Sequence, residues 1–340
     1  MTTTSWTMMT LNITLGTLLA ATSHHWMLAW TGLELNTLAM IPMIAKPHHP
    51  RATEAAIKYF LTQTTASLMI LFAILTGASE TGTWEINQMC NQTTSIILTT
   101  ALPLKMGAAP FHFWLPEVLQ GASTLTSLTI LSWQKLAPLA LMATNTNNLN
   151  QTTLLLMALL SILTGGALGI NQTNLQKLMA YSSISHMGWI MAIIKPAPKI
   201  AAITLTIYII MIIPIFNTMK TMNLKSIKNL NSTKPAQTTL TLNLLSLGGL
   251  PPTSGFIPKL LILNNMITNN LTPLATTMAI LSLLSLYFYL RMTYFILMTN
   301  PPKTSTLTKK WRLPQHKNTM TTTLIMMLST TLLPLTPILM

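Results

Sequence analysis

The sequence predicts an all-α protein that crosses a membrane many times. Half of its 340 residues are hydrophobic and 7% are charged, whereas a soluble globular domain usually carries about 25% charged residues. We count about eleven apolar segments near the length that spans ~30 Å of hydrocarbon as a helix. Two of these segments are broken by proline and glycine and also carry a lysine. The breaks predict discontinuous membrane helices at Lys105 and Lys259.

The expected membrane helices follow one another without a soluble domain between them. Residues 1–340 are therefore expected to form a single transmembrane domain. Its approximate halves are 1–145 and 146–300, and a basic loop and a last helix follow over 301–340. The expected spans are 3–22, 26–44, 56–76, 94–114, 122–143, 152–170, 175–194, 200–219, 238–266, 273–297 and 319–338.

The charges are distributed unevenly between the two sides of the membrane. The formal net charge is +14, but the membrane burial expected for most of the chain excludes a nucleic-acid binder. By the positive-inside rule, the side richer in lysine and arginine faces the compartment of synthesis, together with the N-terminus, and the C-terminus lies opposite. The basic loop 299–318 suits anionic lipid or a partner protein. Loops after odd-numbered spans hold only Lys195 and Lys199, whereas loops after even-numbered spans hold Lys46, Arg51, Lys177, Lys220, Lys225, Lys228, Lys234, Lys303, Lys309, Lys310, Arg312 and Lys317.

The segment Pro103 to Lys135 places two lysines, Lys105 and Lys135, within apolar sequence. A charge at membrane depth is costly and is a functional-site candidate by default. Pro110 cannot donate to the carbonyl of Met106, so backbone oxygens beside Lys105 are expected to leave the helix ladder. Such groups are tolerated where they line water or contact other protein. A broken helix beside a buried base is typical of an ion path.

The same pattern recurs near Lys259. The run GGLPP at 248–252, together with Gly255 and Pro258, interrupts an apolar segment just before this lysine. The recurrence indicates two structurally related halves. It adds Lys259 to Lys105 and Lys135 as a third candidate proton-carrying lysine.

Three further ionisable residues lie in the expected helices. Glu34 is the only carboxylate we place deep in the membrane, where it would either be locked in an ion pair or switch the proton affinity of a lysine. His112 and His186 suit proton relay because imidazole titrates near neutrality, but each could instead be a packing residue. His186 shares a polar stripe with Ser182, Ser185 and Trp189.

Other polar residues are assigned structural roles or none. Glu54 and Lys58 are four residues apart and can pair on one helix face, and Thr53 could cap that helix. Glu117 is expected to be a solvated helix cap. The sequence shows no metal-ligand spacing, and the single cysteine, Cys90, excludes a cysteine-bound iron-sulfur cluster within this chain.

Six motifs, taken together and in order, closely resemble the subunit 2 family of the mitochondrial NADH dehydrogenase, respiratory complex I. The resemblance covers most of the chain and is carried by WTGLE at 30–34, PRATEAAIKYFLTQ at 50–63, LKMGAAPFHFWLPEVLQGA at 104–122, WQKLAP at 133–138, NQTNLQKLMAYSSISHMGW at 171–189 and GGLPPTSGFIPK at 248–259. It implies an antiporter-like fold with two inverted sets of helices. The residues that match the family's proton path are Glu34, Lys105, Lys135 and Lys259, with His112 and His186 on its hydrated axis.

The resemblance implies a proton-translocating subunit of the membrane arm, in the mitochondrial inner membrane, with its N-terminus on the matrix side. NADH oxidation and ubiquinone reduction would occur in other subunits, which hold the flavin, the iron-sulfur clusters and the quinone. This chain would hold no cofactor and no metal. Its partners would be the other membrane-arm subunits in a hetero-oligomer, together with membrane lipids.

Two other classes of function remain open at this point. A free-standing cation/proton antiporter would need the same buried lysines, and only its purification alone or within a large assembly separates it from a complex I subunit. A structural membrane scaffold would predict that neutral substitution of Lys105, Lys135 and Lys259 affects assembly only.

Overall fold

The computed structural model is all-helical over the part of the chain that it describes. It describes residues 3–298 except 47, 89–90, 222–223, 225–233 and 252. The predicted basic loop 299–318, the predicted last helix 319–338 and Cys90 therefore lie outside the described residues. The α-helices are α1 Thr3–Thr22, α2 Trp26–Ala45, α3 Pro50–Thr81, α4 Gln92–Met106, α5 Trp114–Gly121, α6 Thr124–Leu131, α7 Leu136–Thr144, α8 Gln151–Ile170, α9 Leu175–Ile193, α10 Pro198–Thr221, α11 Lys234–Gly248, α12 Phe256–Thr268 and α13 Thr272–Met298, and the short 3₁₀ turns are η1 Ile86–Gln88, η2 Trp133–Lys135 and η3 Thr146–Asn148.

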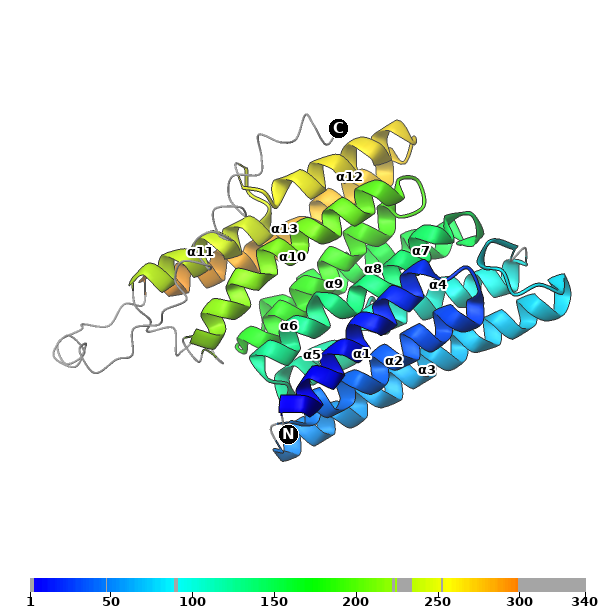
Figure 1. Cartoon of the computed structure of the whole chain (residues 1–340). Coiled ribbons are helices and arrows are strands. Elements are labelled where there is room, and N and C mark those ends of the chain that lie inside the picture. Colours follow the sequence, from blue (N-terminus) through cyan, green and yellow to red (C-terminus); the bar gives the residue numbers. More distant parts are fainter. Residues whose placement is uncertain are drawn as a thin grey trace.

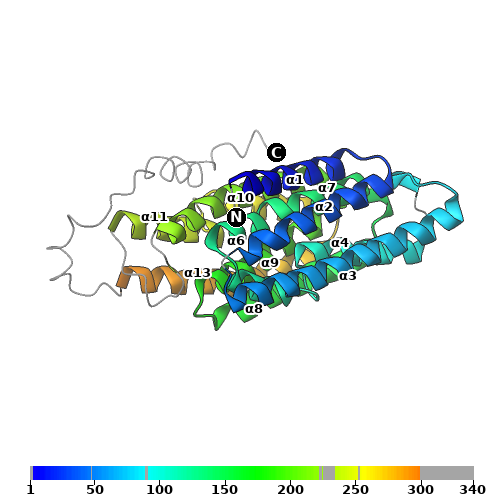
Figure 2. The same cartoon turned by 60° about the horizontal axis from the view of Figure 1, so that its bottom comes forward.

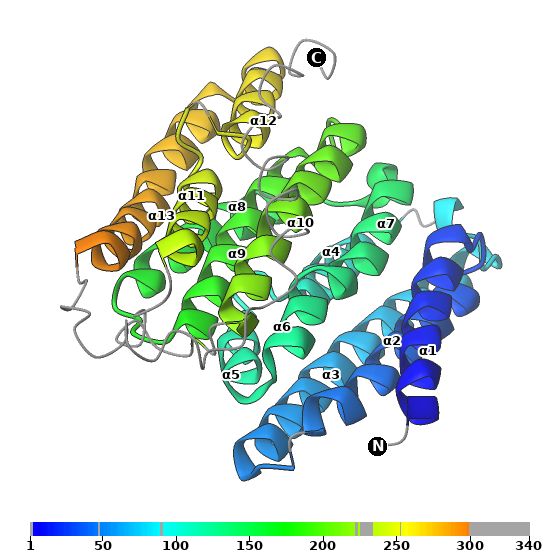
Figure 3. The same cartoon turned by 60° about the vertical axis from the view of Figure 1, so that its left-hand side comes forward.

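The helices run side by side as one elongated bundle (Figure 1). Helices α1 to α3 form one edge of the bundle and α11 to α13 form the other, with α4 to α10 between them (Figure 3). After rotation about the horizontal axis, α1, α2 and α3 again lie together, and α11 and α13 lie at the left of the picture (Figure 2). Neighbours in sequence pack together as α1 with α2, α2 with α3 and α8 with α9, whereas α13 returns to pack against α8 and α11.

Several helices are long and apolar enough to cross a bilayer. Among the described helices, five satisfy both length and hydropathy, namely α2, α3, α8, α10 and α13. Large apolar side chains remain exposed along their outer faces, for example Leu68 at 61% and Phe72 at 57% on α3 and Ile280 at 66% on α13. Without water in the hydrocarbon, helices satisfy their own backbone groups, so exposed apolar faces are compatible with lipid or partner helices. The chain is a multi-pass membrane protein.

The predicted boundaries hold for most of the helices, and the differences have local causes. The third helix begins at Pro50 and not near residue 56, because the His49 side chain accepts a hydrogen bond from the Arg51 amide at 3.2 Å and caps it. Thr53 is therefore not the cap. Its hydroxyl donates to the Pro50 carbonyl at 2.8 Å.

Two expected spans are shorter or more broken than predicted. The span 94–114 ends at Met106, and Trp114 starts the separate short helix α5. The span 122–143 is not continuous, because α6 and α7 are joined by the turn η2 that contains Lys135. Pro138 in the first turn of α7 has no amide hydrogen for the Gln134 carbonyl, which favours a new helix start there.

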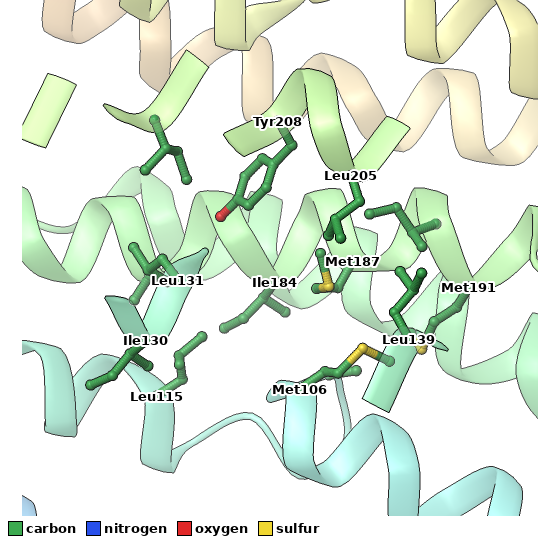
Figure 4. Packing of buried hydrophobic residues seen from close by; sticks show 14 of the residues in the cluster. Met106, Leu115, Ile130, Leu131, Leu139, Ile184, Met187, Met191, Leu205 and Tyr208 are labelled. Atoms are coloured by element: carbon green, nitrogen blue, oxygen red, sulfur yellow. The ribbon is translucent and has the colours of Figure 1, made fainter. Parts of the chain in front are cut away.

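The core lies where the central helices meet. Leu205 and Tyr208 of α10 face Ile184, Met187 and Met191 of α9 (Figure 4). Met106, Leu115 and Leu139 close the same cluster from α4, α5 and α7. Lys105 at 5% exposed and Lys135 at 2% exposed are buried within the same bundle.

Candidate functional site

The first helix break lies at the end of α4, beside Lys105. Gly107 adopts a left-handed backbone conformation with φ of 77°, which glycine reaches without the steric cost of a Cβ atom. The amides of Gly107 and Ala108 donate to the carbonyls of Leu104 at 3.1 Å and Pro103 at 3.0 Å. These bonds end the helix one turn before Pro110 and leave Lys105 in its last turn, where a cation is favoured by the helix dipole.

Two side chains complete the backbone hydrogen bonding at this break. The indole nitrogen of Trp114 donates to the Leu104 carbonyl at 3.3 Å, and the Gln63 amide donates to the Lys105 carbonyl at 3.4 Å. The carbonyls that the break loosens therefore contact other protein. The Lys105 backbone is fixed by α3 and α5, whereas its amine has no hydrogen-bond partner in the described structure.

A small cavity joins Lys105 to Lys135. Its volume is about 10 Å³, at the lower limit of what one water molecule needs. Lys105 and Lys135 both line it, and they are 5% and 2% exposed. The lining also includes the side-chain amides of Asn36 and Gln134, and buried amide atoms of both lack protein partners. Buried polar groups need hydrogen bonds, so this polar lining suits a proton carrier such as water.

Lys135 is held on the turn between α6 and α7. The amide of Lys135 donates to the Ser132 carbonyl at 3.4 Å, and the Ser132 hydroxyl donates to the Leu128 carbonyl at 2.7 Å. The Lys135 amine lies 5.1 Å from the centroid of the Tyr208 ring. The break in this helix therefore turns the amine towards α10.

The second helix break separates α11 from α12 and carries Lys259. Gly249 has φ of 74°, and its amide donates to the Ser246 carbonyl at 3.0 Å. Lys259 lies in the first turn of α12, and its partly buried amine donates to the Gly248 carbonyl at 2.7 Å. The amine thus caps the C-terminal end of α11, where the helix dipole favours a cation.

A second small cavity joins Lys259 to His186. Its volume is about 10 Å³, and its lining includes His186 of α9, Tyr208 of α10 and Lys259. The His186 and Tyr208 ring centroids are 5.1 Å apart at an interplanar angle of 44°. Lys135 and Lys259 both lie within electrostatic range of the His186 imidazole. His186 therefore lies between the central lysine and the lysine of the second break.

Glu34 lies near this line of residues but does not contact a lysine directly. It sits on α2, half-buried, and its Oε2 atom is buried without a protein partner. It is within electrostatic range of Lys105 and Tyr59. Among the described residues, the ion pairs within 4.0 Å involve Lys58 and not Glu34.

His112 is separate from both cavities. It is 3% exposed, its Nδ1 atom is 3.3 Å from the Pro110 carbonyl oxygen, and its ring stacks on Phe113 at 4.3 Å. It lines neither the cavity of Lys105 and Lys135 nor that of His186 and Lys259. Four of the six predicted site residues, Lys105, Lys135, His186 and Lys259, line the two cavities, whereas Glu34 and His112 line neither.

A charged cluster lies outside the cavities, at the start of α3. Lys58 forms ion pairs with Glu54 at 2.5 Å and with Glu117 of α5 at 2.6 Å. The predicted pairing of Glu54 with Lys58 is confirmed. Glu117 lies in the first turn of α5 with its side chain 50% exposed, as the prediction of a solvated helix end requires, and it also pairs with Lys58 of α3, which was not predicted. Within the described part of the chain, no group of three or more His, Cys, Asp or Glu residues is placed to hold a metal ion.

The sequence reasoning missed four polar residues that shape these sites. Asn36 and Gln134 line the first cavity, Gln63 binds the Lys105 backbone, and Tyr208 lies between the two lysine environments. Each is a polar side chain within an apolar helix. That signal was present, but without a structure it did not distinguish a cavity-lining residue from one that bonds its own helix.

The comparisons with known proteins agree with the geometry. Residues 23–285 match the family described as "NADH:quinone oxidoreductase/Mrp antiporter, TM". Residues 286–340 match "NADH dehydrogenase subunit 2 C-terminus". The fold resembles a chain of the respiratory complex I from Thermus thermophilus, with a TM-score of 0.80 and 22% identity, over 98% of this chain and 78% of that chain. The protein is therefore of the antiporter-like class of membrane subunits.

Full-length relatives identify the particular subunit. The chain is 50% identical over 337 residues to the NADH-ubiquinone oxidoreductase chain 2 of Lycodon semicarinatus, covering 98% of each. It is 46% identical over 333 residues to that of Gallus gallus, covering 97% of this chain and 96% of the relative. The chain belongs to the NADH-ubiquinone oxidoreductase chain 2 family and is a membrane subunit of respiratory complex I.

Proposed function

We propose that this chain carries protons across the membrane through Lys105, Lys135, His186 and Lys259. The observation that carries the proposal is the cavity lined by both Lys105 and Lys135, whose buried amines have no hydrogen-bond partner in the described part of the chain. A buried amine without a partner is costly. An amine that alternates between charged and neutral forms beside a water-sized cavity can take up a proton and release it.

The proposed path has three steps. The protonated Lys105 amine gives its proton through water in the first cavity to the neutral Lys135 amine. Lys135 then passes the proton past Tyr208 towards His186, and His186 passes it through the second cavity to Lys259. His112 lies outside both cavities, so we assign it a packing role beside Pro110.

Glu34 is proposed to control the first step. Two opposite charges about 4 Å apart at an effective dielectric of ~20 interact by ~4 kcal/mol, which is equivalent to about three pKa units. If Glu34 moves against Lys105, the amine keeps its proton; if the two separate, the proton is released. The arrangement of Glu34 near Lys105 without an ion pair corresponds to the separated state.

The proposed membrane topology is supported by the distribution of charges and by the helix order. We propose about eleven membrane crossings in two inverted sets, in the mitochondrial inner membrane, with the N-terminus on the matrix side. The end of α2 and the start of α3 lie at the same end of the bundle as the N-terminus (Figure 3), and Lys46 follows α2 while Arg51 lies in the first turn of α3. Glu80 and Glu85 lie at the far end of α3. The matrix side would contact anionic lipids and neighbouring subunits.

The energy for the pump is proposed to come from electron transfer in other subunits. The flavin, the iron-sulfur clusters and the quinone would be held there, and NADH oxidation would drive the opening and closing of the Glu34–Lys105 pair. Protons would move from the matrix to the intermembrane space.

The proposal is tested by replacing Lys135 with Met in the assembled complex reconstituted into vesicles. We expect normal assembly, and proton pumping driven by NADH reduced to background. Lys199→Met is the matched control, because Lys199 is an exposed lysine outside the cavities, and it should pump normally. An assembled Lys135→Met complex with undiminished pumping and NADH oxidation would falsify the proposed path.

A further inference from the structure

Tyr208 occupies the gap between the two lysine environments. It is 1% exposed, and it lines the cavity of His186 and Lys259. Its ring centroid is 5.1 Å from the Lys135 amine and 5.1 Å from the His186 ring centroid. Tyr208 thus lies beside Lys135, which lines the first cavity, and beside His186, which lines the second.

The ring offers the Lys135 amine an attractive surface. An aromatic face carries negative charge density, and a cation within about 6 Å of its centroid is attracted to it, most strongly when both groups are desolvated. Lys135 is 2% exposed and its amine has no hydrogen-bond partner in the described structure. The Tyr208 ring therefore stabilises the charged form of Lys135 in this position.

Apolar side chains of α6, α9 and α10 lie beside the Tyr208 ring (Figure 4). Tyr208 extends from α10 towards α9 and α6, with Leu131, Ile184 and Leu205 nearby (Figure 4). Apolar groups cannot carry a proton. Because the Tyr208 ring lies 5.1 Å from both the Lys135 amine and the His186 ring, we expect the passage between these two residues to run beside it.

We infer that Tyr208 is a positioning residue that holds the Lys135 ammonium against its ring at the partition between the two cavities. The proton then moves on to His186 when the amine leaves the ring. This inference rests on the proposed function. It adds Tyr208 as the residue that stabilises the protonated form of Lys135 before the proton moves on to His186.

The first test compares Tyr208→Phe with Tyr208→Leu in the assembled complex. Phenylalanine keeps the aromatic face, so we expect pumping close to that of the unchanged complex. Leucine removes the face, and we expect proton transfer to slow roughly 2- to 30-fold, the range of cation–π contributions. Phe216→Leu is the control, because Phe216 is a buried aromatic residue of the same helix, 2% exposed, that lines neither cavity. It should leave the proton-to-NADH ratio unchanged.

A second test separates ring charge from packing. Phenylalanine and a ring-trifluorinated phenylalanine at position 208 fill nearly the same space, but fluorine withdraws the negative charge from the ring face. We expect slower pumping with the fluorinated ring, and equal rates would overturn the inference. This pair still decides the matter if Tyr208→Leu fails to assemble.

The outcomes also separate this inference from the proposed function. If Lys135→Met pumps normally, the whole path is wrong. If Lys135→Met does not pump, but Tyr208→Leu and the fluorinated variant pump like the unchanged complex, the path stands and the role of Tyr208 is wrong.

Discussion

The two broken helices of this chain look alike in sequence but hold their lysines in opposite ways. In both, the first helix ends at a left-handed glycine, Gly107 or Gly249. Lys105 precedes its break, lines the same cavity as Lys135, and has an amine without a hydrogen-bond partner among the described residues. Lys259 follows its break, and its amine is bound to the carbonyl of Gly248 at 2.7 Å.

The difference lies in which group satisfies the loosened backbone carbonyls. At the first break, side chains from α3 and α5 do so, which leaves the Lys105 amine free for other contacts. At the second break the Lys259 amine itself does so. Hydrogen bonds from a charged donor are about twice as strong as neutral ones. When Lys259 gives up its proton, it therefore weakens the end of α11, whereas Lys105 can titrate without weakening α4.

The largest expected effect comes from replacing each lysine with Met. Lys105→Met and Lys259→Met should both abolish pumping, but they should differ in stability. Losing the Lys259 hydrogen bond should destabilise the α11 end by about 1.5–3 kcal/mol. Losing the unpartnered Lys105 amine should be neutral or stabilising. Hydrogen exchange at the amides flanking each break, in the assembled complex, measures the local difference.

That comparison includes its own control, because each variant is the reference for the other break. Lys105→Met should leave exchange around Gly249 unchanged, and Lys259→Met should leave exchange around Gly107 unchanged. Faster exchange at the α4 end in Lys105→Met would show that the Lys105 amine supports the helix end after all.

Alanine at each glycine should give the next largest effect. A left-handed conformation costs a non-glycine residue about 1–2 kcal/mol, so Gly107→Ala and Gly249→Ala should both loosen their breaks. A Cβ at Gly249 would lie 2.9 Å from the Lys259 amine nitrogen, whereas one at Gly107 would lie 3.2 Å from the Trp114 ring. Gly249→Ala should therefore displace the Lys259 amine and lower pumping more than Gly107→Ala, as measured by proton uptake in vesicles.

Equal pumping in the two alanine variants, with equal complex content, would contradict this expectation. It would mean that the position of the Lys259 amine does not limit proton transfer.

The sequence predicted the helices well because apolar length is a direct signal of a membrane span. The expected span 152–170 corresponds to α8 at Gln151–Ile170, and 175–194 corresponds to α9 at Leu175–Ile193. It also placed Lys105 and Lys259 correctly at the two breaks. A proline-glycine cluster beside a lysine carries this information locally.

The contacts between helices could not be predicted from local sequence as the helix spans were. Nothing local distinguishes the Lys259 amine, which caps α11, from the Lys105 amine, which faces a cavity. The pairing of Lys58 with Glu117 joins residues 59 positions apart, and the position of Tyr208 beside Lys135 depends on how α10 packs against the η2 turn. The break at Lys135 was missed because Pro138 lies in the first turn of the new helix, where proline does not end it.

A smaller effect is expected at Trp114, whose indole donates a hydrogen bond to a backbone carbonyl at the first break. Trp114→Phe removes the indole hydrogen bond to the Leu104 carbonyl and should cost about 0.5–1.5 kcal/mol. Exchange should quicken at Gly107 and Ala108 and stay unchanged at Gly249. Trp133→Phe is the control, since Trp133 is 39% exposed. The same change in both variants would show a general loss of packing.

The smallest effect is expected at the ion pairs of Lys58, one of which joins α3 to α5 beside the first break. The described residues of the second break form no such ion pair. Glu117→Gln should weaken the hold of α3 on α5 and slightly quicken amide exchange in α5. Lys58 and Glu117 side chains are 40% and 50% exposed, so salt should screen the pair and the difference should vanish at high ionic strength. Glu54→Gln removes a pair within α3 only and should leave α5 unchanged. Equal increases in α5 amide exchange in both variants, at every salt concentration, would contradict this expectation. They would show that packing and not charge holds α5 against α3. The first break would then depend on apolar contacts, as the core does.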